Sequence, residues 1–285
     1  MIRCLAFVLV ALLSAGRAAA QDAPSPFAYQ PDRVPEGTVY HYTKSNLDGT
    51  RAAELYVFVA SATDLELLKL EPQSTTAAYV RADMDWNAFA AARLDAWHLT
   101  ENGLTPQLYL DFDHDAQEAT AYMGPMAMPV SFEAEPVHLY NFDLMSLNAA
   151  LPHLRAPEAD FTIGIVDPNW ELFAGEQVEP QPVLDDGLLY KGKAHFTYQG
   201  QDIYRGIICR KYGVDGPGLD DQEGTLWVSA EDGHIVLFEH PTPDNPAWSS
   251  FKLEWKETVP MTGGAWRGFM MQMQQQHAAA LQAQN

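Results

Sequence analysis

Three carboxylates and one imidazole lie within five residues in the stretch DFDHD, Asp111–Asp115. Oxygen-rich runs of this kind can hold a divalent cation, and a carboxylate beside a histidine can act as an acid–base pair. A calcium-binding loop would need Gly at its sixth position and Glu at its twelfth, where this chain has Ala116 and Tyr122. We therefore predict no metal site and interpret the stretch as the polar end of a strand. An adventitious cation site is the alternative.

The common sequence signatures of catalysis are missing. The chain has no G-x-S-x-G elbow, no H-E-x-x-H motif and no glycine-rich phosphate loop of the known patterns. With 38 acidic residues, carboxylate pairs are too frequent to identify a glycosidase, and only their separation in space would do so. Five scattered histidines could converge in the fold: His98, His114, His153, His195 and His240. We predict no catalytic residue and no cofactor.

Aromatic residues are the stronger binding signal, because the chain has 7 Trp, 12 Tyr and 13 Phe. Trp227, Trp97 and Trp86 lie on or beside predicted strands, and we predict that they contact a ligand. In "TLWVS" the alternation places Leu226 and Val228 on one face and Trp227 on the other. If the leucine and valine face the core, Trp227 is the best candidate for a ligand-facing aromatic. Filling of the core is the alternative role for these side chains.

The elements that must position these residues are mostly strands. "QLYLDFD", "FTIGIV", "IYRGIICRKYG" and "FKLEWKE" are each expected to form one strand, and Gly, Asp and Pro clusters separate the runs. One central helix is predicted within residues 140–154, capped by Asn141 or Asp143 and ended by Pro152. Its leucines recur three or four residues apart and form one apolar stripe.

The predicted fold class is mainly β. Strands precede and follow the central helix, so we expect one large curved antiparallel sheet, a half-barrel or lipocalin-like barrel, with a C-terminal helix. The predicted division is a signal peptide at 1–20, an extended leader at 21–37, a single antiparallel β-rich domain at 38–262 and a helical tail at 263–285. The signal rests on Arg3, a short apolar run and small residues before a cleavage site at Ala20.

Charge and cysteine content limit the partners. Lys and Arg number 17 and Asp and Glu number 38, which gives a net charge of −21. Such a surface repels nucleic-acid phosphates, so we predict no nucleic-acid partner.

After removal of the signal only Cys209 would remain, so no intramolecular disulfide could form. We predict a periplasmic or secreted protein with no integral membrane segment in the mature chain.

The segment Gly224–His240 resembles a known hairpin. Its run Leu226–Val228, its Asp232–Gly233 turn and the pair Ile235–Val236 are similar to the L-W-[VI]-D-x-x-[TD]-G hairpin of bacterial periplasmic LolA/LolB-like lipoprotein-sorting half-barrels. Ser229 stands where that pattern commonly has Asp. The resemblance implies a curved antiparallel sheet wrapped on a helix, with an apolar hollow for acyl chains, and it implies no catalytic residue.

These observations predict an exported soluble protein that binds an apolar or amphipathic ligand, a lipid or lipoprotein acyl chain, in the bacterial envelope. An envelope protein is a further candidate partner. The alternative is a secreted hydrolase that acts on a polysaccharide or ester through a carboxylate pair. A third interpretation is an accessory protein whose sheet edge or C-terminal helix docks on a partner. A deep apolar hollow favours the first, and facing carboxyls across a polar groove favour the second.

Overall fold

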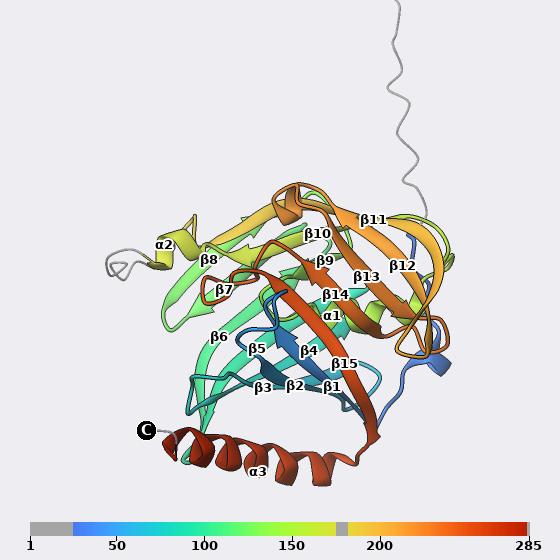
Figure 1. Ribbon diagram of the computed structural model, residues 1–285. Coiled ribbons are helices and arrows are strands. Elements are labelled where there is room, and N and C mark those ends of the chain that lie inside the picture. Colours follow the sequence, from blue (N-terminus) through green and yellow to red (C-terminus); the bar gives the residue numbers. More distant parts are fainter. Residues whose placement is uncertain (1–24, 175–181, 284–285) are drawn as a thin grey trace, which may run out of the picture.

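The computed structural model describes residues 25–174 and 182–283 (Figure 1). The predicted signal peptide at 1–20 lies outside the described residues. The strands are β1 (Thr38–Ser45), β2 (Ala53–Val59), β3 (Asp64–Leu70), β4 (Ala77–Asp85), β5 (Ala90–Thr100), β6 (Gly103–Asp113), β7 (Glu118–Met123), β8 (Met126–Ser131), β9 (Val137–Leu139), β10 (Phe161–Pro168), β11 (Leu188–Tyr204), β12 (Ile207–Asp215), β13 (Gly224–Ser229), β14 (Ile235–His240) and β15 (Phe251–Pro260). The helices are α1 (Met145–Ala150), α2 (Trp170–Ala174) and α3 (Gly263–Gln282), with short 3₁₀ turns at Pro31–Arg33, Leu151–His153 and Pro217–Leu219.

These strands form one sheet in the order β8-β7-β6-β5-β4-β3-β2-β1-β15-β14-β13-β12-β11-β10-β9. Neighbouring strands are antiparallel, except that β9 runs parallel to β10. The predicted fold class is thereby confirmed: a large curved antiparallel sheet, a central helix and a C-terminal helix. The division into leader, domain and tail stays a prediction.

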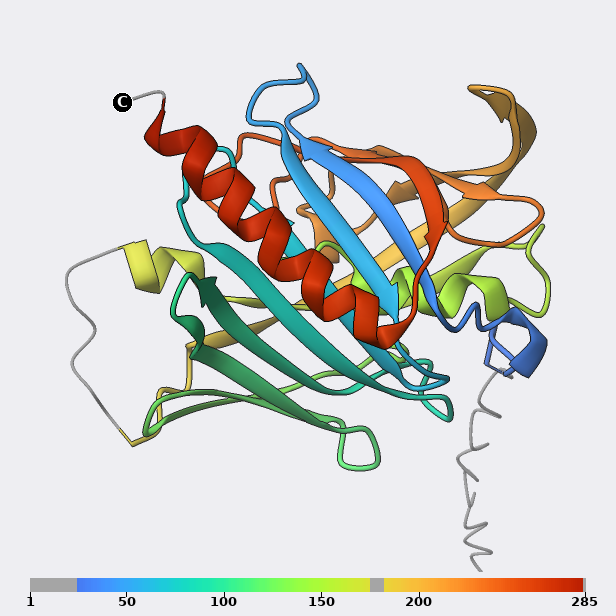
Figure 2. The same cartoon turned by 90° about the horizontal axis from the view of Figure 1, so that it is seen from below.

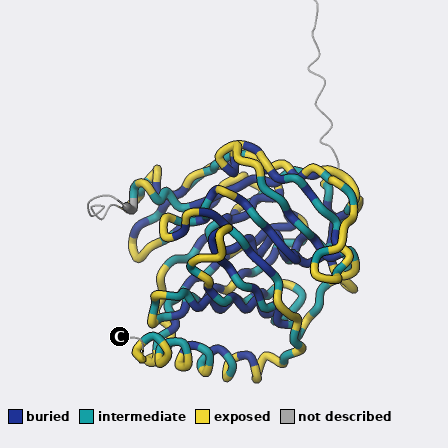
Figure 3. The backbone as a smooth tube through the Cα atoms, viewed as in Figure 1, coloured by how far each residue is buried: buried dark blue, intermediate teal, exposed yellow. Residues whose placement is uncertain are grey.

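The curvature brings one edge of the sheet close to the segment that leads into β11. The amide of Ala127 in β8 donates to the carbonyl of Pro182 at 3.0 Å, and the amide of Leu184 donates to the carbonyl of Ala127 at 2.8 Å. The sheet therefore curls until its β8 edge lies beside residues 182–184, and buried positions gather in its interior in Figure 3.

Helix α1 lies against the concave face and fills its centre. The predicted helix is shorter than residues 140–154: of the four leucines expected to form its apolar stripe only Leu147 lies in α1, although Leu144, Leu147, Leu151 and Leu154 are all buried in the main core. The side chain of Asn148 also fixes the helix, since its amide donates to the Tyr42 hydroxyl at 3.0 Å and its carbonyl oxygen accepts from the Ile235 amide at 2.7 Å.

Helix α3 covers the convex face of β1–β5, as Figure 2 shows. Thr262 caps its start by accepting a hydrogen bond from the Ala265 amide at 3.4 Å. Trp266 is 1% exposed, stacks on Phe58 with ring centroids 5.2 Å apart, and donates from Nε1 to Glu66 at 2.6 Å. This second, smaller core joins the C-terminal helix to the first half of the sheet.

Candidate functional site

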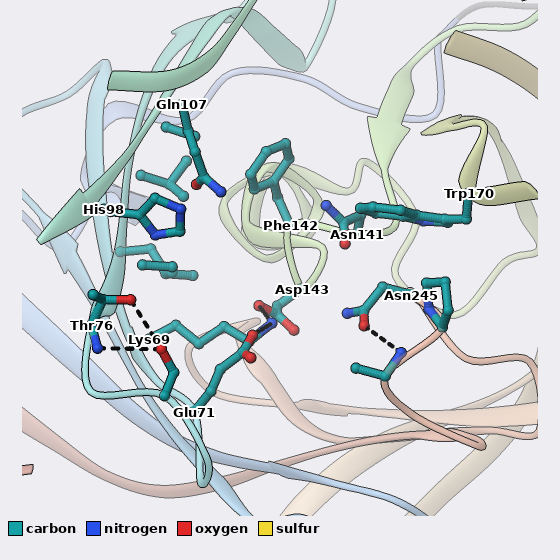
Figure 4. Close-up of a pocket in the computed structure, with 17 residues that line it drawn as sticks. Lys69, Glu71, Thr76, His98, Gln107, Asn141, Phe142, Asp143, Trp170 and Asn245 are labelled. Atoms are coloured by element: carbon teal, nitrogen blue, oxygen red, sulfur yellow. Dashed lines mark hydrogen bonds and ion pairs between the residues drawn. The ribbon is translucent and has the colours of Figure 1, made fainter. Parts of the chain in front are cut away.

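A cavity of about 530 Å³ opens on the concave face of the sheet near the ends of β3–β6 (Figure 4). We call it the polar chamber, because its lining includes Lys69, Glu71, His98, Gln107, Asp143 and Asn245. Strand alternation explains part of the lining: Leu67 and Lys69 share a face of β3, and Ala96 and His98 share a face of β5.

Gln107 reaches the chamber through an irregularity in β6. Ala96 pairs with Leu108 and Trp97 pairs with Pro106, so Gln107 is the extra residue of a β-bulge. A bulge redirects the side chain that it inserts. In Figure 4 the Gln107 amide and the His98 ring both point into the open space.

A second hollow of about 250 Å³ adjoins the first and is mainly apolar. We call it the apolar chamber, and its lining includes Leu108, Ala121, Met123, Met128 and Leu188. Both chambers are lined by Ala96, Gln107, Asn141, Phe142 and Trp170, which lie where the two chambers meet. The Trp170 indole is held by a hydrogen bond from Nε1 to the carbonyl of Asp244 at 3.2 Å. The site therefore joins a polar compartment to an apolar one.

A buried network of ion pairs supports the floor of the polar chamber. The Lys44 ammonium lies 2.9 Å from Asp143 Oδ1 and also contacts Asp244, while Lys69 Nζ lies 3.3 Å from Asp143 Oδ2. All four side chains are buried. The ring of Trp248 lies 4.7 Å from Lys44 Nζ and adds a cation–π contact. Charges removed from water in this way are tolerated only when each is paired.

Burial and neighbouring charges set the pKa values in this network. Burial raises the pKa of Asp143, but the ammonium groups of Lys44 and Lys69 outweigh it and bring that pKa below its usual value. Burial lowers the pKa of Lys44 and raises the pKa of Asp244, because both would lose hydration as ions. Burial alone would lower the pKa of Lys69, yet Asp143, Asp244 and Glu71 raise it overall. Asp143 and Lys69 are therefore the firmly charged members.

The backbone around Asp143 departs from the prediction. Asp143 and Leu144 have φ values of 54° and 53°, so the helix begins only at Met145 and neither Asn141 nor Asp143 caps it with a side chain. A left-handed conformation at a non-glycine residue is strained. With this backbone conformation the Asp143 carboxylate lies beside the two lysines and caps no helix amide.

The sequence contains a signal for this network, which lies in strand alternation and not in a catalytic or metal-binding motif. In "DLELLKL" the alternation places Lys69 on the same face as Leu65 and Leu67, and in β1 it places Lys44 with Tyr40 and Tyr42. A lysine on the apolar face of a strand is rarely buried unless it is paired. Such positions therefore predict a buried acid elsewhere in the chain.

The three predicted tryptophans lie apart from one another. Trp227 is on the convex face of β13, 5.7 Å from the Tyr204 ring and 5.0 Å from Lys211 Nζ. Trp97 is also on the convex face, where it packs in the core under α3. Trp86 lines a separate hollow of about 30 Å³ and donates from Nε1 to the Ala62 carbonyl at 2.8 Å. None of the three lines the polar or apolar chamber, and their contact with a ligand stays a prediction.

The stretch DFDHD ends a strand, as predicted from its alternation. β6 ends at Asp113, whose carboxylate accepts from the Ala116 amide at 2.9 Å in the turn to β7. Asp111 pairs with Arg93 at 3.3 Å, and His114 Nδ1 lies 3.1 Å from a carboxylate oxygen of Glu135. Across residues 25–174 and 182–283, no group of three or more His, Cys, Asp or Glu side chains could hold a metal ion.

The five histidines singled out in the sequence do not form one cluster. Only His98 of these five lines the polar chamber, while His153 packs against Trp86 at a centroid distance of 4.7 Å. Burial lowers the pKa of His153 to about 4 and also lowers the pKa of His240.

In the part of the chain that the structure describes, no helix is long and apolar enough to cross a membrane.

Comparison with known proteins gives only distant similarity. No protein-family model matches the chain, and no curated protein matches its sequence. The chain is similar to a crystallised domain from Vibrio parahaemolyticus that is described as an outer membrane lipoprotein-sorting protein, with a TM-score of 0.29, 9% identity, and coverage of 84% of this chain and 94% of that chain. It is also similar to a DUF1329 family protein from Desulfovibrio piger ATCC 29098, with a TM-score of 0.27, 12% identity and coverage of 81% and 89%. This weak similarity agrees with the resemblance of the Gly224–His240 hairpin.

Proposed function

We propose that this protein binds an amphipathic ligand, with the polar part of the ligand in the polar chamber and its apolar part in the apolar chamber. The observation that carries the proposal is the junction of the two chambers at Phe142 and Trp170. The chamber volumes, about 530 and 250 Å³, are of the order found for small-molecule sites. A ligand that crossed the junction would have one end hydrated or hydrogen-bonded and the other removed from water.

The lining of the apolar chamber suits an acyl chain. Met123 and Met128 face it together with Leu108 and Leu188. Methionine has a flexible, polarizable side chain that adapts to irregular apolar surfaces. Each methylene group that leaves water contributes about 0.8 kcal/mol, so a short acyl chain would supply useful affinity. A lipid or lipoprotein acyl chain in the bacterial envelope is the ligand we propose, in keeping with the predicted export signal.

No observation on the described residues favours the hydrolase alternative. The acids that line the polar chamber are Glu71 and Asp143, and both pair with Lys69, at 3.5 and 3.3 Å. A general acid or base must be free to exchange a proton with the substrate. Carboxylates that neutralise the same ammonium are better suited to holding the chamber in shape.

A pair of matched substitutions tests the proposed site. Trp170→Ala removes the wall that both chambers share, and Trp227→Ala removes a tryptophan of similar partial exposure that lies outside them. We expect Trp170→Ala to weaken the binding of a fluorescent fatty-acid probe about tenfold or more, while Trp227→Ala leaves it unchanged. The earlier prediction that Trp227 faces the ligand requires the opposite ranking. Failure of the parent protein to bind the probe in any form would contradict the proposed function.

A further inference from the structure

The charges of the polar chamber are already neutralised within the protein. Lys69, its only lysine, pairs with Asp143 and Glu71, and the Asp143 carboxylate is shared with buried Lys44. A carboxylate or phosphate on a ligand would have to displace an acid from Lys69, and an ammonium group would have to displace Lys69 from its acids. Either exchange would leave a charge unpaired beside the buried side chains of Lys69 and Asp143, which is costly.

Three side chains in the polar chamber, two amides and one imidazole, have no partner among the residues that the structure describes. Gln107, Asn141 and His98 line the chamber, and their side chains make no hydrogen bond or ion pair there. Each amide offers a carbonyl acceptor and an NH₂ donor, and neither amide carries a charge. Figure 4 shows the three side chains around the open space of the chamber.

The other polar groups nearby are already engaged. Asn245 donates from Nδ2 to Asp244 Oδ1 at 3.3 Å, and its carbonyl oxygen accepts from the Ala247 amide at 3.0 Å. The hydroxyls of Ser74 and Thr76 lie 2.9 Å apart. The two free amides of Gln107 and Asn141 are therefore uncharged hydrogen-bonding groups left for a ligand, and they line the same chamber as the fixed indole of Trp170.

We infer that the polar end of the ligand is an uncharged, hydroxyl-bearing group, such as the sugar or glycerol headgroup of a neutral lipid. Hydroxyls both donate and accept, as the free amides of Gln107 and Asn141 require, and they add no charge to a balanced network. The flat face of Trp170 offers an apolar surface to the C–H face of a ring. This inference rests on the proposed function, because it concerns the polar end of the same amphipathic ligand.

The test compares amphiphiles that share one dodecyl chain and differ in the headgroup. Calorimetric titration of the full mature chain would use dodecyl maltoside, laurate and dodecylphosphocholine, each below its critical micelle concentration, together with free maltose. We expect the maltoside to bind about tenfold or more tightly than laurate and dodecylphosphocholine. Free maltose should bind at least tenfold more weakly than the maltoside, since it lacks the chain that enters the apolar chamber.

A matched pair of glutamine variants assigns the effect to the polar chamber. Gln107→Ala should weaken maltoside binding about threefold to tenfold, as expected for one uncharged hydrogen bond, and should weaken laurate binding by a smaller factor. Gln199→Ala is the control, because Gln199 is an exposed glutamine on β11 that lies outside both chambers. Both positions are exposed, so neither variant should disturb folding.

The outcomes separate the two proposals. Binding of laurate or dodecylphosphocholine as tight as that of the maltoside overturns the inference about the headgroup and leaves the proposed function intact. An equal loss for all three amphiphiles in Gln107→Ala also overturns it. Failure of all three to bind overturns both proposals. Free maltose that binds as tightly as dodecyl maltoside supports the hydroxyl-bearing group but contradicts the apolar half of the proposed function.

Discussion

The carboxylate of Asp143 lies 2.9 Å from the ammonium of Lys44, and neither side chain is accessible to solvent. Lys44 belongs to β1, in the middle of the sheet, and Asp143 immediately precedes the helix that fills the concave face. Because Lys69 holds the other carboxylate oxygen, one acid joins two strands to the start of α1. The position of Phe142, next to Asp143 and between the two chambers, depends on this contact.

Asp143→Asn should therefore be strongly destabilising. Asparagine keeps the size of the side chain and accepts a left-handed backbone, but it leaves two buried lysines short of one negative charge. We expect a loss of about 3–5 kcal/mol in the free energy of unfolding, measured with urea. The control is Asp111→Asn, which removes an exposed pair with Arg93 and should cost about 0–1 kcal/mol. Equal costs for the two variants would show that the buried network contributes little.

Acid should destabilise the protein through buried His138. This side chain is 0% exposed, and burial lowers its pKa to about 3 from an ordinary value near 6.5. The folded pKa lies below the unfolded one, so protonation favours the unfolded chain and stability falls as the pH drops below about 6.5. The effect of this one group is about 2 kcal/mol between pH 6.5 and pH 5.

The contribution of His138 can be isolated with His138→Gln, which cannot take up a proton. Asp167 and Asp244 have pKa values raised by burial and act with the opposite sign, so the absolute stability of one protein is not informative. The difference in unfolding free energy between parent and variant removes their contribution. We expect that difference to shift by about 2 kcal/mol in favour of the variant over this range. A difference that is constant with pH would contradict the assignment.

The C-terminal helix should depend on Trp266. Trp266→Ala removes a buried indole, its stacking on Phe58 and its hydrogen bond to Glu66, so we expect a loss of about 3–5 kcal/mol in urea unfolding. Trp227→Ala should cost less, because Trp227 lies partly exposed on the convex face. A similar cost for both substitutions would mean that α3 adds little to stability.

Metal removal should leave folding unchanged. The sequence from Asp111 onward does not match a calcium-binding loop. Among residues 25–174 and 182–283, no cluster of His, Cys, Asp or Glu side chains could hold a metal ion. Thermal unfolding with and without a chelator should give the same midpoint. A decrease of more than about ten degrees would reveal a structural ion, since loss of a bound metal removes its binding free energy from the fold.

Alternation predicted the strands well because a half-buried strand repeats every two residues. "FTIGIV" lies in β10 (Phe161–Pro168) and "QLYLDFD" lies in β6. The expectation for "IYRGIICRKYG" was wrong: Arg205 and Gly206, with φ values of 48° and 85°, form a turn between β11 and β12. Positive φ at both central residues is the geometry of a tight hairpin turn, and an arginine at the first position gives little sign of it.

The candidate site could not be predicted in the same way. Trp170 and Asn245 come from segments without periodic apolar patterns, Phe142 precedes the helix α1, and only the closure of the sheet brings the three together. The two-residue alternation of the strand correctly placed Trp227 on the face opposite the core side chains Leu226 and Val228. It could not tell which face of the sheet is concave, because curvature depends on the whole strand order.

The order of strands in the sheet also bears on how the polypeptide acquires its structure. β1 pairs with β15, so the first and last strands meet in the middle of the sheet. The runs β1–β8 and β10–β15 can each grow through hairpins between sequence neighbours, but the seam between them cannot close until Phe251–Pro260 has been synthesised. A chain truncated before β15 would carry two unpaired strand edges, β1 and β14, where self-association is favoured. Synthesis of nearly the whole chain must therefore precede completion of the sheet.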